Sequence, residues 1–366
     1  MNIVYGVSGE GLGHVYEALE IAALLEADGH AVKVLTYGDR AFRSLAAFHP
    51  TRIEGVQLCF DSEGLSLWRT FRGSAHCFPF YARNGRRLLR ELAGFRPDVF
   101  LTAYEPFTTF AAHWMRKPLV SMDNQNELRH MPRPRDAGVF AFHLARLTTQ
   151  VVTFGAAEYI VKSFGMPEPR EKNVHRVAPI LQNEIRRLQP TDGSHVLVYL
   201  TKPNPDLIEV LKSMDETFVV YCHNRVGEEG NISHRAQGPG YLRDLASCKA
   251  ILGTTGFSLI ADSIYLRKPY FGVPLRKQFE QTHNAVFLKD SGLGEFSEKV
   301  TRADLEAFLA RLPEYRRKLA AFRFDPAEQE KALRGILAKL QEESARARQG
   351  GAPAPDAGSS FRTTQP

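Results

Sequence analysis

The sequence predicts an α/β protein with two doubly wound domains that face each other across a cleft. The chain has 366 residues, more than a single domain usually contains. Short apolar runs alternate with helical patterns in both halves, which is typical of βαβ units. A segment containing Pro179 and Pro190 separates the halves. We therefore expect domains over 1–170 and 195–330 and a linker over 171–194.

The first half opens with a βαβ unit. An apolar strand over Asn2–Val7 leads into a glycine-rich turn, and a helical pattern over Val15–Asp28 follows. Gly29 ends this helix in the manner of a C-cap. The later elements are expected to be strands over Ala31–Tyr37, Asp98–Ala103, Leu119–Met122 and Gln150–Thr153, and helices over Tyr81–Gly94 and Thr109–Met115.

The second half repeats the same alternation of strand and helix. Parallel strands bring their carboxyl ends to one edge of a sheet, and ligands of doubly wound domains bind at that edge. A charged helix over 331–348 and a disordered tail over 349–366, rich in Gly, Pro, Ser and Ala, are expected to follow. The second-half strands are expected over His195–Leu200, Phe218–Cys222, Ala250–Gly253 and Tyr270–Val273, and its helices over Pro205–Met214, Tyr241–Cys248 and Phe257–Leu266.

Composition excludes several classes of protein. No run approaches about 18 apolar residues, so no transmembrane helix is expected, and the N-terminus has no signal-peptide pattern. The four cysteines have no CxxC spacing and are expected to be reduced thiols in a cytoplasmic protein. Lys and Arg (47) exceed Asp and Glu (41) by 6, which favours an anionic ligand or membrane surface over nucleic acid.

The turn after the first strand carries the first candidate site. Its pattern approaches the dinucleotide motif GxGxxG, but His14 stands where the last glycine belongs. The second strand also lacks an acidic residue at its end, so NAD is not expected. In the first turn of a helix, His14 would be held neutral and could accept a proton. The alternative is a capping or packing histidine.

Two further segments point to a nucleotide sugar. The turn from Gly253 to Gly256 precedes a helix whose N-terminus could hold a diphosphate, and Asp262 could accept hydrogen bonds from ribose hydroxyls. The alternative for Asp262 is a solvated helix acid. Glu280, Gln281 and Asn284 offer the groups that bind sugar hydroxyls, although they could equally cap their own helix.

In order along the chain, GEGLGH (Gly9–His14), TTGFSLIAD (Thr254–Asp262) and FEQTHNA (Phe279–Ala285) resemble the MurG-like glycosyltransferases. The resemblance covers about residues 1–340 and implies the GT-B fold, with two Rossmann-like domains. The extended N-terminal motif Gly6–His14, with Glu105-Pro106 and Asp123-Asn124-Gln125, also resembles a less characterised archaeal and bacterial group of this superfamily. Asp262 and Glu280 replace the usual Glu and Gln of the family, which leaves the base and the sugar open.

The resemblance implies transfer of a sugar from a nucleoside diphosphate sugar, expected to be UDP-linked, to a lipid-linked or glycan hydroxyl. No cofactor and no metal are expected. Retaining enzymes of the commonest GT-B type carry a first glutamate where this chain has Thr255, so inversion is expected. The implied site residues are His14, Asp123 and Glu105 as candidate bases; Thr201, Lys202, Thr254, Thr255, Gly256, Phe257, Asp262, Glu280, Gln281 and Asn284 for the donor; and Glu10, Gly11, Gly13 and Asn124 for the acceptor.

Arginines and aromatic residues alternate over Trp68–Arg96, and further basic residues lie over Arg129–Arg135. This pattern favours an acceptor surface that meets the inner face of a membrane. The alternative is a core helix with a solvated basic face. Two other functions stay open: a sugar-nucleotide 2-epimerase, and a non-catalytic protein that binds nucleotide sugars.

Overall fold

The structure is a computed structural model that describes residues 1–9, 12–55, 60–61, 64–65, 72–130, 139–165, 168–223, 225–275 and 278–349. Two of the predicted acceptor residues, Glu10 and Gly11, and the predicted tail beyond residue 349 lie outside the described residues. Three of the cysteines are described, and they are free thiols: Cys77, Cys222 and Cys248.

The first half of the chain forms a seven-stranded sheet within the described residues, and all of its strand pairs are parallel. Its inner strands are buried along almost their whole length, as expected for apolar runs covered on both faces. In spatial order the strands are β3 (Thr51–Arg52), β2 (Ala31–Thr36), β1 (Asn2–Val7), β6 (Val99–Ala103), β7 (Leu119–Asp123), β8 (Glu158–Lys162) and β9 (Val174–Val177).

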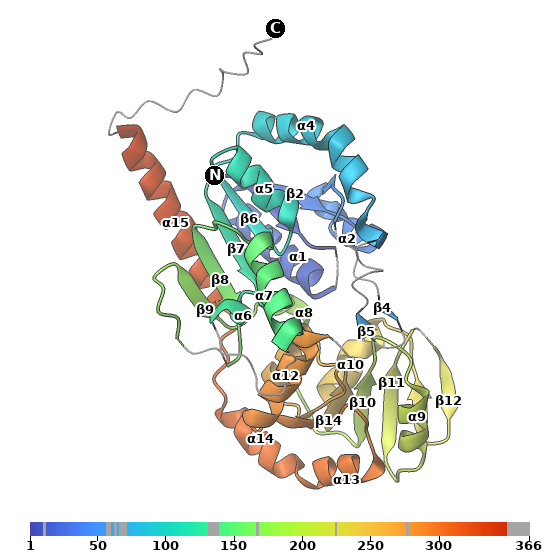
Figure 1. The fold of residues 1–366 in the computed structure, drawn as a ribbon. Coiled ribbons are helices and arrows are strands. Elements are labelled where there is room, and N and C mark those ends of the chain that lie inside the picture. Colours follow the sequence, from blue (N-terminus) through green and yellow to red (C-terminus); the bar gives the residue numbers. More distant parts are fainter. Residues whose placement is uncertain are drawn as a thin grey trace.

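The second half forms another seven-stranded sheet, parallel except for the pair β12–β13 at one edge. The doubly wound α/β fold is therefore present twice, and Figure 1 shows the two sheets in separate halves of the molecule. In spatial order the strands are β12 (Gly227–Glu229), β13 (Ile232–His234), β11 (Thr217–Tyr221), β10 (His195–Tyr199), β14 (Ala250–Gly253), β15 (Tyr270–Gly272) and β16 (Gly294–Phe296).

Helices cover both faces of each sheet and bury a separate apolar cluster on each face. The first sheet carries α1 (Leu12–Ala27), α2 (Asp39–Ser44), η1 (Ala46–Phe48), α4 (Cys77–Phe95), α5 (Pro106–Trp114), α6 (Glu127–His130) and α7 (Val139–Val152). The strands β4 (Phe60–Asp61) and β5 (Gly64–Leu65) form a separate antiparallel pair. The later helices are α8 (Asn183–Arg186), α9 (Pro205–Lys212), α10 (Pro239–Ser247), α11 (Phe257–Tyr265), α12 (Phe279–Asp290), α13 (Arg302–Ala310), α14 (Leu312–Ala321) and α15 (Glu328–Gln349).

The last helix, α15, returns from the second half to the first, where Figure 1 shows it in red beside β8 and β9. Leu333, Ile336, Leu337 and Leu340 are buried in the same apolar cluster as β1 and α1. The first half is therefore completed by residues from the end of the described chain.

Two sequence-based expectations are corrected. The strand expected over Gln150–Thr153 is the C-terminal end of α7 and the turn after it, and the strand of this region is β8. Thr149 and Thr153 donate their hydroxyls to carbonyls four residues earlier, so the β-branched run continues a helix. The range 171–194, expected as a linker, contains β9 and α8. β9 is a short, half-exposed edge strand, whose hydrophobic alternation is too brief to predict it.

Candidate functional site

His14 lies in the first turn of α1, directly beyond the carboxyl end of β1. Its Nε2 is 3.4 Å from the amide nitrogen of Gln125, and its buried Nδ1 has no hydrogen-bond partner among the described residues. Burial, and secondarily the positive charge of Lys162, lowers the pKa of His14 to about 3. The imidazole is therefore neutral at physiological pH.

Asp123, a candidate base from the sequence, ends β7 and is fully buried. Its carboxylate accepts hydrogen bonds from the Asn126 backbone N–H (2.7 Å), the Asn126 side-chain amide (2.8 Å) and the Ser121 hydroxyl (2.6 Å). Burial raises the pKa of Asp123, and these hydrogen bonds oppose the rise. The carboxylate thereby shapes the turn that presents Asn124 and Gln125.

Glu105, the other candidate carboxylate, is the N-cap of α5 and is also fully buried. It accepts hydrogen bonds from the backbone N–H groups of Phe107 (2.8 Å) and Thr108 (2.7 Å) and from the Thr108 hydroxyl (2.6 Å). Burial raises the pKa of Glu105 against these bonds. Within the described chain, no hydrogen bond joins Glu105 or Asp123 to His14. A glutamate before a proline at a helix start is itself a capping signal.

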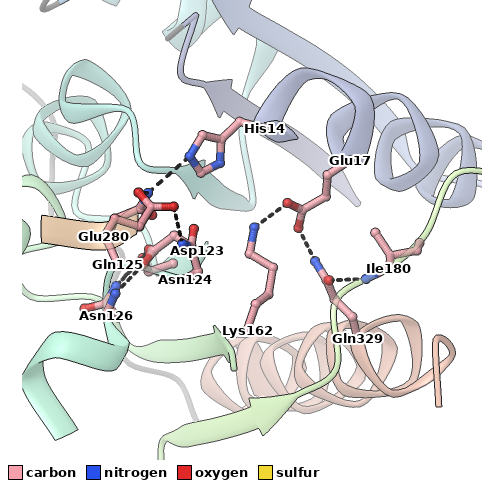
Figure 2. Close-up of polar contacts among 11 residues, drawn as sticks. His14, Glu17, Asp123, Asn124, Gln125, Asn126, Lys162, Ile180, Glu280 and Gln329 are labelled. Atoms are coloured by element: carbon pink, nitrogen blue, oxygen red, sulfur yellow. Dashed lines mark hydrogen bonds and ion pairs between the residues drawn. The ribbon is translucent and has the colours of Figure 1, made fainter. Parts of the chain in front are cut away.

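Glu280 brings the two halves together. It lies in the first turn of α12, and its carboxylate accepts a hydrogen bond from the Asn124 side-chain amide at 2.9 Å. The Gln125 amide lies 3.5 Å from the other oxygen of Glu280 and also approaches His14 (Figure 2). Burial raises the pKa of Glu280, while Asn124, Gln125, Lys162 and His283 oppose the rise. Sequence reasoning selected His14, Asn124 and Glu280 but missed the role of Gln125.

The N-termini of α1 and α11 lie close together. A Cβ atom added to Gly13 would lie 2.4 Å from the Ser258 hydroxyl, so a larger residue at this position would require the Ser258 side chain to move. The first turn of α11 presents backbone N–H groups without intrahelical partners, as every helix does. Gly256 is the N-cap of α11, two residues before Ser258.

Other predicted donor residues hold the loops of the second half in place. The Thr255 hydroxyl donates to the Gln281 carbonyl (2.7 Å), and the Asn284 amide donates to the Thr255 carbonyl (3.0 Å). The Gln281 side chain accepts from the Leu275 backbone N–H at 2.9 Å. Thr254 is buried, and its carbonyl accepts from the Tyr270 hydroxyl at 2.7 Å. These contacts tie the start of α11 to α12.

Phe257, also predicted at the donor site, stacks on Phe164 with ring centroids 4.5 Å apart. Phe164 follows β8 of the first half, so this contact is packing between the halves. Thr201 and Lys202 follow β10, whose end adjoins Thr254 through a backbone hydrogen bond from Thr254 to Tyr199 of 3.1 Å. The two residues therefore lie at the carboxyl edge of the second sheet, beside the start of α11.

Asp262 lies on α11 and is half-buried, with no hydrogen-bond partner for its carboxylate among the described residues. Burial raises the pKa of Asp262 to about 7. Its charge in turn raises the pKa values of Tyr241 and Tyr270, so these rings are its neighbours. A carboxylate held in this way is available to accept hydrogen bonds from a ligand.

The described residues contain no group of three or more His, Cys, Asp or Glu side chains that could hold a metal ion. Among the described helices, none combines the length and apolar character needed to cross a bilayer.

The sequence matches the family described as Glycosyl transferase family 1 over residues 1–313. A search among curated proteins finds no significant match. Solved structures share the fold along most of the chain. The glycosyltransferase of kitacinnamycin is 17% identical, with 93% of this chain and 98% of that chain covered and a TM-score of 0.62. The glycosyltransferase VinC, solved in complex with dTDP, is 14% identical, with 94% of this chain and 100% of that chain covered and a TM-score of 0.60. The glycosyltransferase SnogD from Streptomyces nogalater is 17% identical, with 92% of this chain and 99% of that chain covered and a TM-score of 0.58. These matches show the GT-B fold.

Proposed function

Because the chain belongs to glycosyl transferase family 1 and is a glycosyltransferase, we propose that it transfers a sugar from a nucleoside diphosphate sugar to a hydroxyl acceptor, with inversion and without a metal. One observation carries the proposal. The neutral imidazole of His14 has no hydrogen-bond partner at Nδ1 among the described residues, and its turn approaches the N-terminus of α11 at Gly13 and Ser258. Asp262, a carboxylate with no hydrogen-bond partner among the described residues, lies further along α11.

The donor is placed by α11. The N–H groups of its first turn and the positive end of its dipole suit a diphosphate, and Asp262 lies six residues beyond Gly256 to receive the ribose hydroxyls. VinC was solved with dTDP, and the glycosyltransferase SsfS6 with thymidine diphosphate, which supports a nucleoside diphosphate at the corresponding site. We propose a UDP-sugar as the first donor to test and a TDP-sugar as its comparison.

His14 is the proposed general base. As the acceptor oxygen forms its bond to the anomeric carbon, the bond from that carbon to the diphosphate oxygen breaks, and the hydroxyl proton passes to Nε2 or Nδ1 of His14. The charge released on the diphosphate is stabilised by the start of α11. Attack from the side opposite the diphosphate inverts the anomeric centre. Asp123 and Glu105 are less suited to this role, since their oxygens are occupied by donors of their own turns.

The acceptor side suggests a membrane contact, in keeping with a MurG-like subgroup. Phe110 and Trp114 of α5 and Val151 of α7 expose 52%, 66% and 66% of their surfaces. The two helices are joined by a hydrogen bond from the Thr109 hydroxyl to the Val152 carbonyl (2.6 Å). α4, in the same half of the molecule (Figure 1), carries Arg83, Arg86, Arg87 and Arg90. Exposed aromatic residues in a half of the molecule that also carries an arginine-rich helix favour an anionic lipid surface and hence a lipid-linked acceptor.

Replacing His14 with Asn tests the proposed transfer. We expect kcat to fall about 10²–10⁴-fold, the usual contribution of a general base, while the affinity for the nucleoside diphosphate stays unchanged. The release of nucleoside diphosphate gives kcat, and calorimetric titration gives the affinity, after UDP- and TDP-sugars have been compared by thermal shift.

His175→Asn is the control, because the described partner of the His175 ring is Glu158 on β8, and not a residue near His14. Near-normal kcat in His14→Asn would overturn the base assignment. Binding of a donor without transfer to any acceptor would favour a non-catalytic binding protein, and release of the 2-epimer would favour an epimerase.

A further inference from the structure

A buried ion pair lies directly behind His14. Lys162, at the end of β8, donates a hydrogen bond from Nζ to the carboxylate of Glu17 (Figure 2). Glu17 lies on α1, three residues after His14, and so on the same side of that helix. The side chains of Lys162 and Glu17 are only 3% and 8% exposed, which removes most of the screening that weakens surface ion pairs.

The ion pair continues into the last helix. The second oxygen of Glu17 accepts a hydrogen bond from the side-chain amide of Gln329, which is fully buried in α15. The Gln329 carbonyl oxygen in turn accepts the Ile180 backbone N–H at 2.8 Å. Both Glu17 oxygens are thus used, and the turn of α1 that follows His14 is tied to β8 and α15 at once.

The charged groups around His14 come from four elements. Lys162 faces it from β8, Asp123 from β7, Glu280 from α12, and Glu17 follows it on α1 (Figure 2). Of these, only Lys162 contributes to the shift of the His14 pKa; burial is the larger cause, and both lower the pKa. The same ammonium also lowers the pKa values of Asp123 and Glu280 against the effect of burial. One cation therefore faces the three groups nearest the proposed reaction.

We propose that Lys162 is a positioning residue for His14. Its ion pair with Glu17, completed by Gln329, fixes the first turns of α1 against the first sheet and places the amino group of Lys162 behind the imidazole. The inference rests on the proposed function because it assumes that His14 takes up the acceptor proton. No motif in the sequence indicates it, since the partners come from three distant segments.

The titration of His14 itself tests the inference. Carbon-13-labelled histidine gives one Cε1–Hε1 signal per ring, and the signal lost in His14→Asn identifies His14. In Lys162→Met we expect the His14 midpoint to rise by roughly 1–3 pH units, the usual effect of a nearby charge. In turnover assays kcat should fall, because the turn that carries His14 is no longer held against the first sheet, and the acidic limb of kcat should move to higher pH.

Lys268→Met is the matched control. Lys268 is also a buried lysine, 2% exposed, but it donates to the carbonyls of Thr191 (2.6 Å) and Cys248 (2.8 Å) in the second half. It should cost stability and leave the His14 midpoint where it is. Where Lys162→Met fails to fold, the double variant Lys162→Met with Glu17→Gln carries the test, because removing both charges of a buried pair is better tolerated. In the double variant the His14 midpoint should still rise, but by less than in Lys162→Met, because the negative charge of Glu17 no longer stabilises the protonated imidazole.

A His14 midpoint that is unchanged in both Lys162 variants overturns the inference, whatever the turnover assay shows. A raised midpoint in a protein that transfers sugar supports it. If the His14 midpoint rises but the wild-type protein transfers sugar from none of the donors tested, the effect of the Lys162 charge on His14 is supported. That result counts only against the proposed transfer reaction.

Discussion

A carboxylate that is partly removed from water and has no hydrogen-bond partner destabilises a folded protein when it is charged. Asp262 on α11 is half-buried and has no such partner among the described residues, and this burial raises its pKa to about 7. His14 shows the opposite sign, since burial lowers the pKa of a group whose charged form is the cation. In both cases burial favours the neutral form of the side chain.

Asp262→Asn should weaken binding of the nucleoside diphosphate about 10- to 150-fold, because hydrogen bonds to a charged group contribute about 1.5–3 kcal/mol. In the wild type the affinity should increase as pH rises through about 7, where Asp262 ionises, and in the variant it should be independent of pH in that range. Calorimetric titration of both proteins across this range measures it. Equal dissociation constants at high pH would show that Asp262 does not touch the ribose.

The same substitution should change stability without ligand. The pKa of Asp262 is higher in the folded than in the unfolded chain, so its contribution to stability is full below the ordinary Asp pKa and is lost as pH rises through about 7. Asp262→Asn removes that loss and should raise the Tm at pH 8 relative to wild type, with little effect at pH 4. A lower Tm for the variant at pH 8 would contradict this account.

At the scale of elements, α15 belongs to the first half, although its sequence follows the second. Leu333 is fully buried beside β1 and α1, and Gln329 reaches Glu17. Surface pairs such as Arg334–Asp28 add little on their own, because exposed ion pairs contribute about 0–1 kcal/mol. The buried apolar residues of α15 therefore contribute most of the free energy by which this helix stabilises the first half.

Leu333→Ala should lower the free energy of unfolding by about 2–5 kcal/mol, through lost apolar contact and the cavity that remains. Urea unfolding monitored by circular dichroism measures the loss. Lys331→Ala, on the exposed side of the same helix, should change stability by no more than about 1 kcal/mol. Similar losses in both variants would mean that α15 does not depend on its apolar face.

At the scale of the whole molecule, a few polar contacts join the halves around the cleft. Asn124 donates to Glu280, and His283 of α12 lies 3.5 Å from a Glu127 oxygen in α6. Phe164 of the first half stacks on Phe257 and Phe287 of the second. The relative placement of His14 and α11 depends on these contacts, because no strand pair crosses between the two sheets in the described chain.

Asn124→Ala should loosen this junction. Losing a hydrogen bond to a charged group, worth about 1.5–3 kcal/mol, should speed amide hydrogen exchange in the first turn of α12 by roughly 10- to 150-fold where exchange follows local opening. Asn173→Ala is the control, because its amide donates to the Ala157 carbonyl on the first sheet only. Unchanged exchange at α12 in Asn124→Ala would show that Glu280 is held by other groups.

Transfer should also proceed without a divalent cation. The positive end of α11 and nearby basic side chains are expected to meet the diphosphate charge. Turnover in excess chelator should equal turnover with added Mg²⁺ or Mn²⁺, measured by release of nucleoside diphosphate. Activity that vanishes in chelator and returns with metal would contradict this expectation.

Local patterns were enough to predict the fold class and the position of the turns that carry several candidate residues. Apolar runs that end in small residues predicted β1 and β14, and parallel topology placed His14, Asn124 and Gly256 at the carboxyl edges of two sheets. The sequence also indicates hydrogen bonds between a capping side chain and the first turn of its helix. Glu105 before Pro106 carries the signal of a helix N-cap, a role that the structure shows.

The sequence by itself therefore determined the two doubly wound halves, the glycine turns and the residues that could carry chemistry, because these depend on contacts within a few residues. Only the tertiary structure decided that Gln125 joins His14 to Glu280, that Lys162 faces His14 from β8, and that α15 completes the first half. These contacts bring together side chains as far as 312 residues apart, as between Gln329 and Glu17. Their energies come from burial and charge that exist only once the chain is packed.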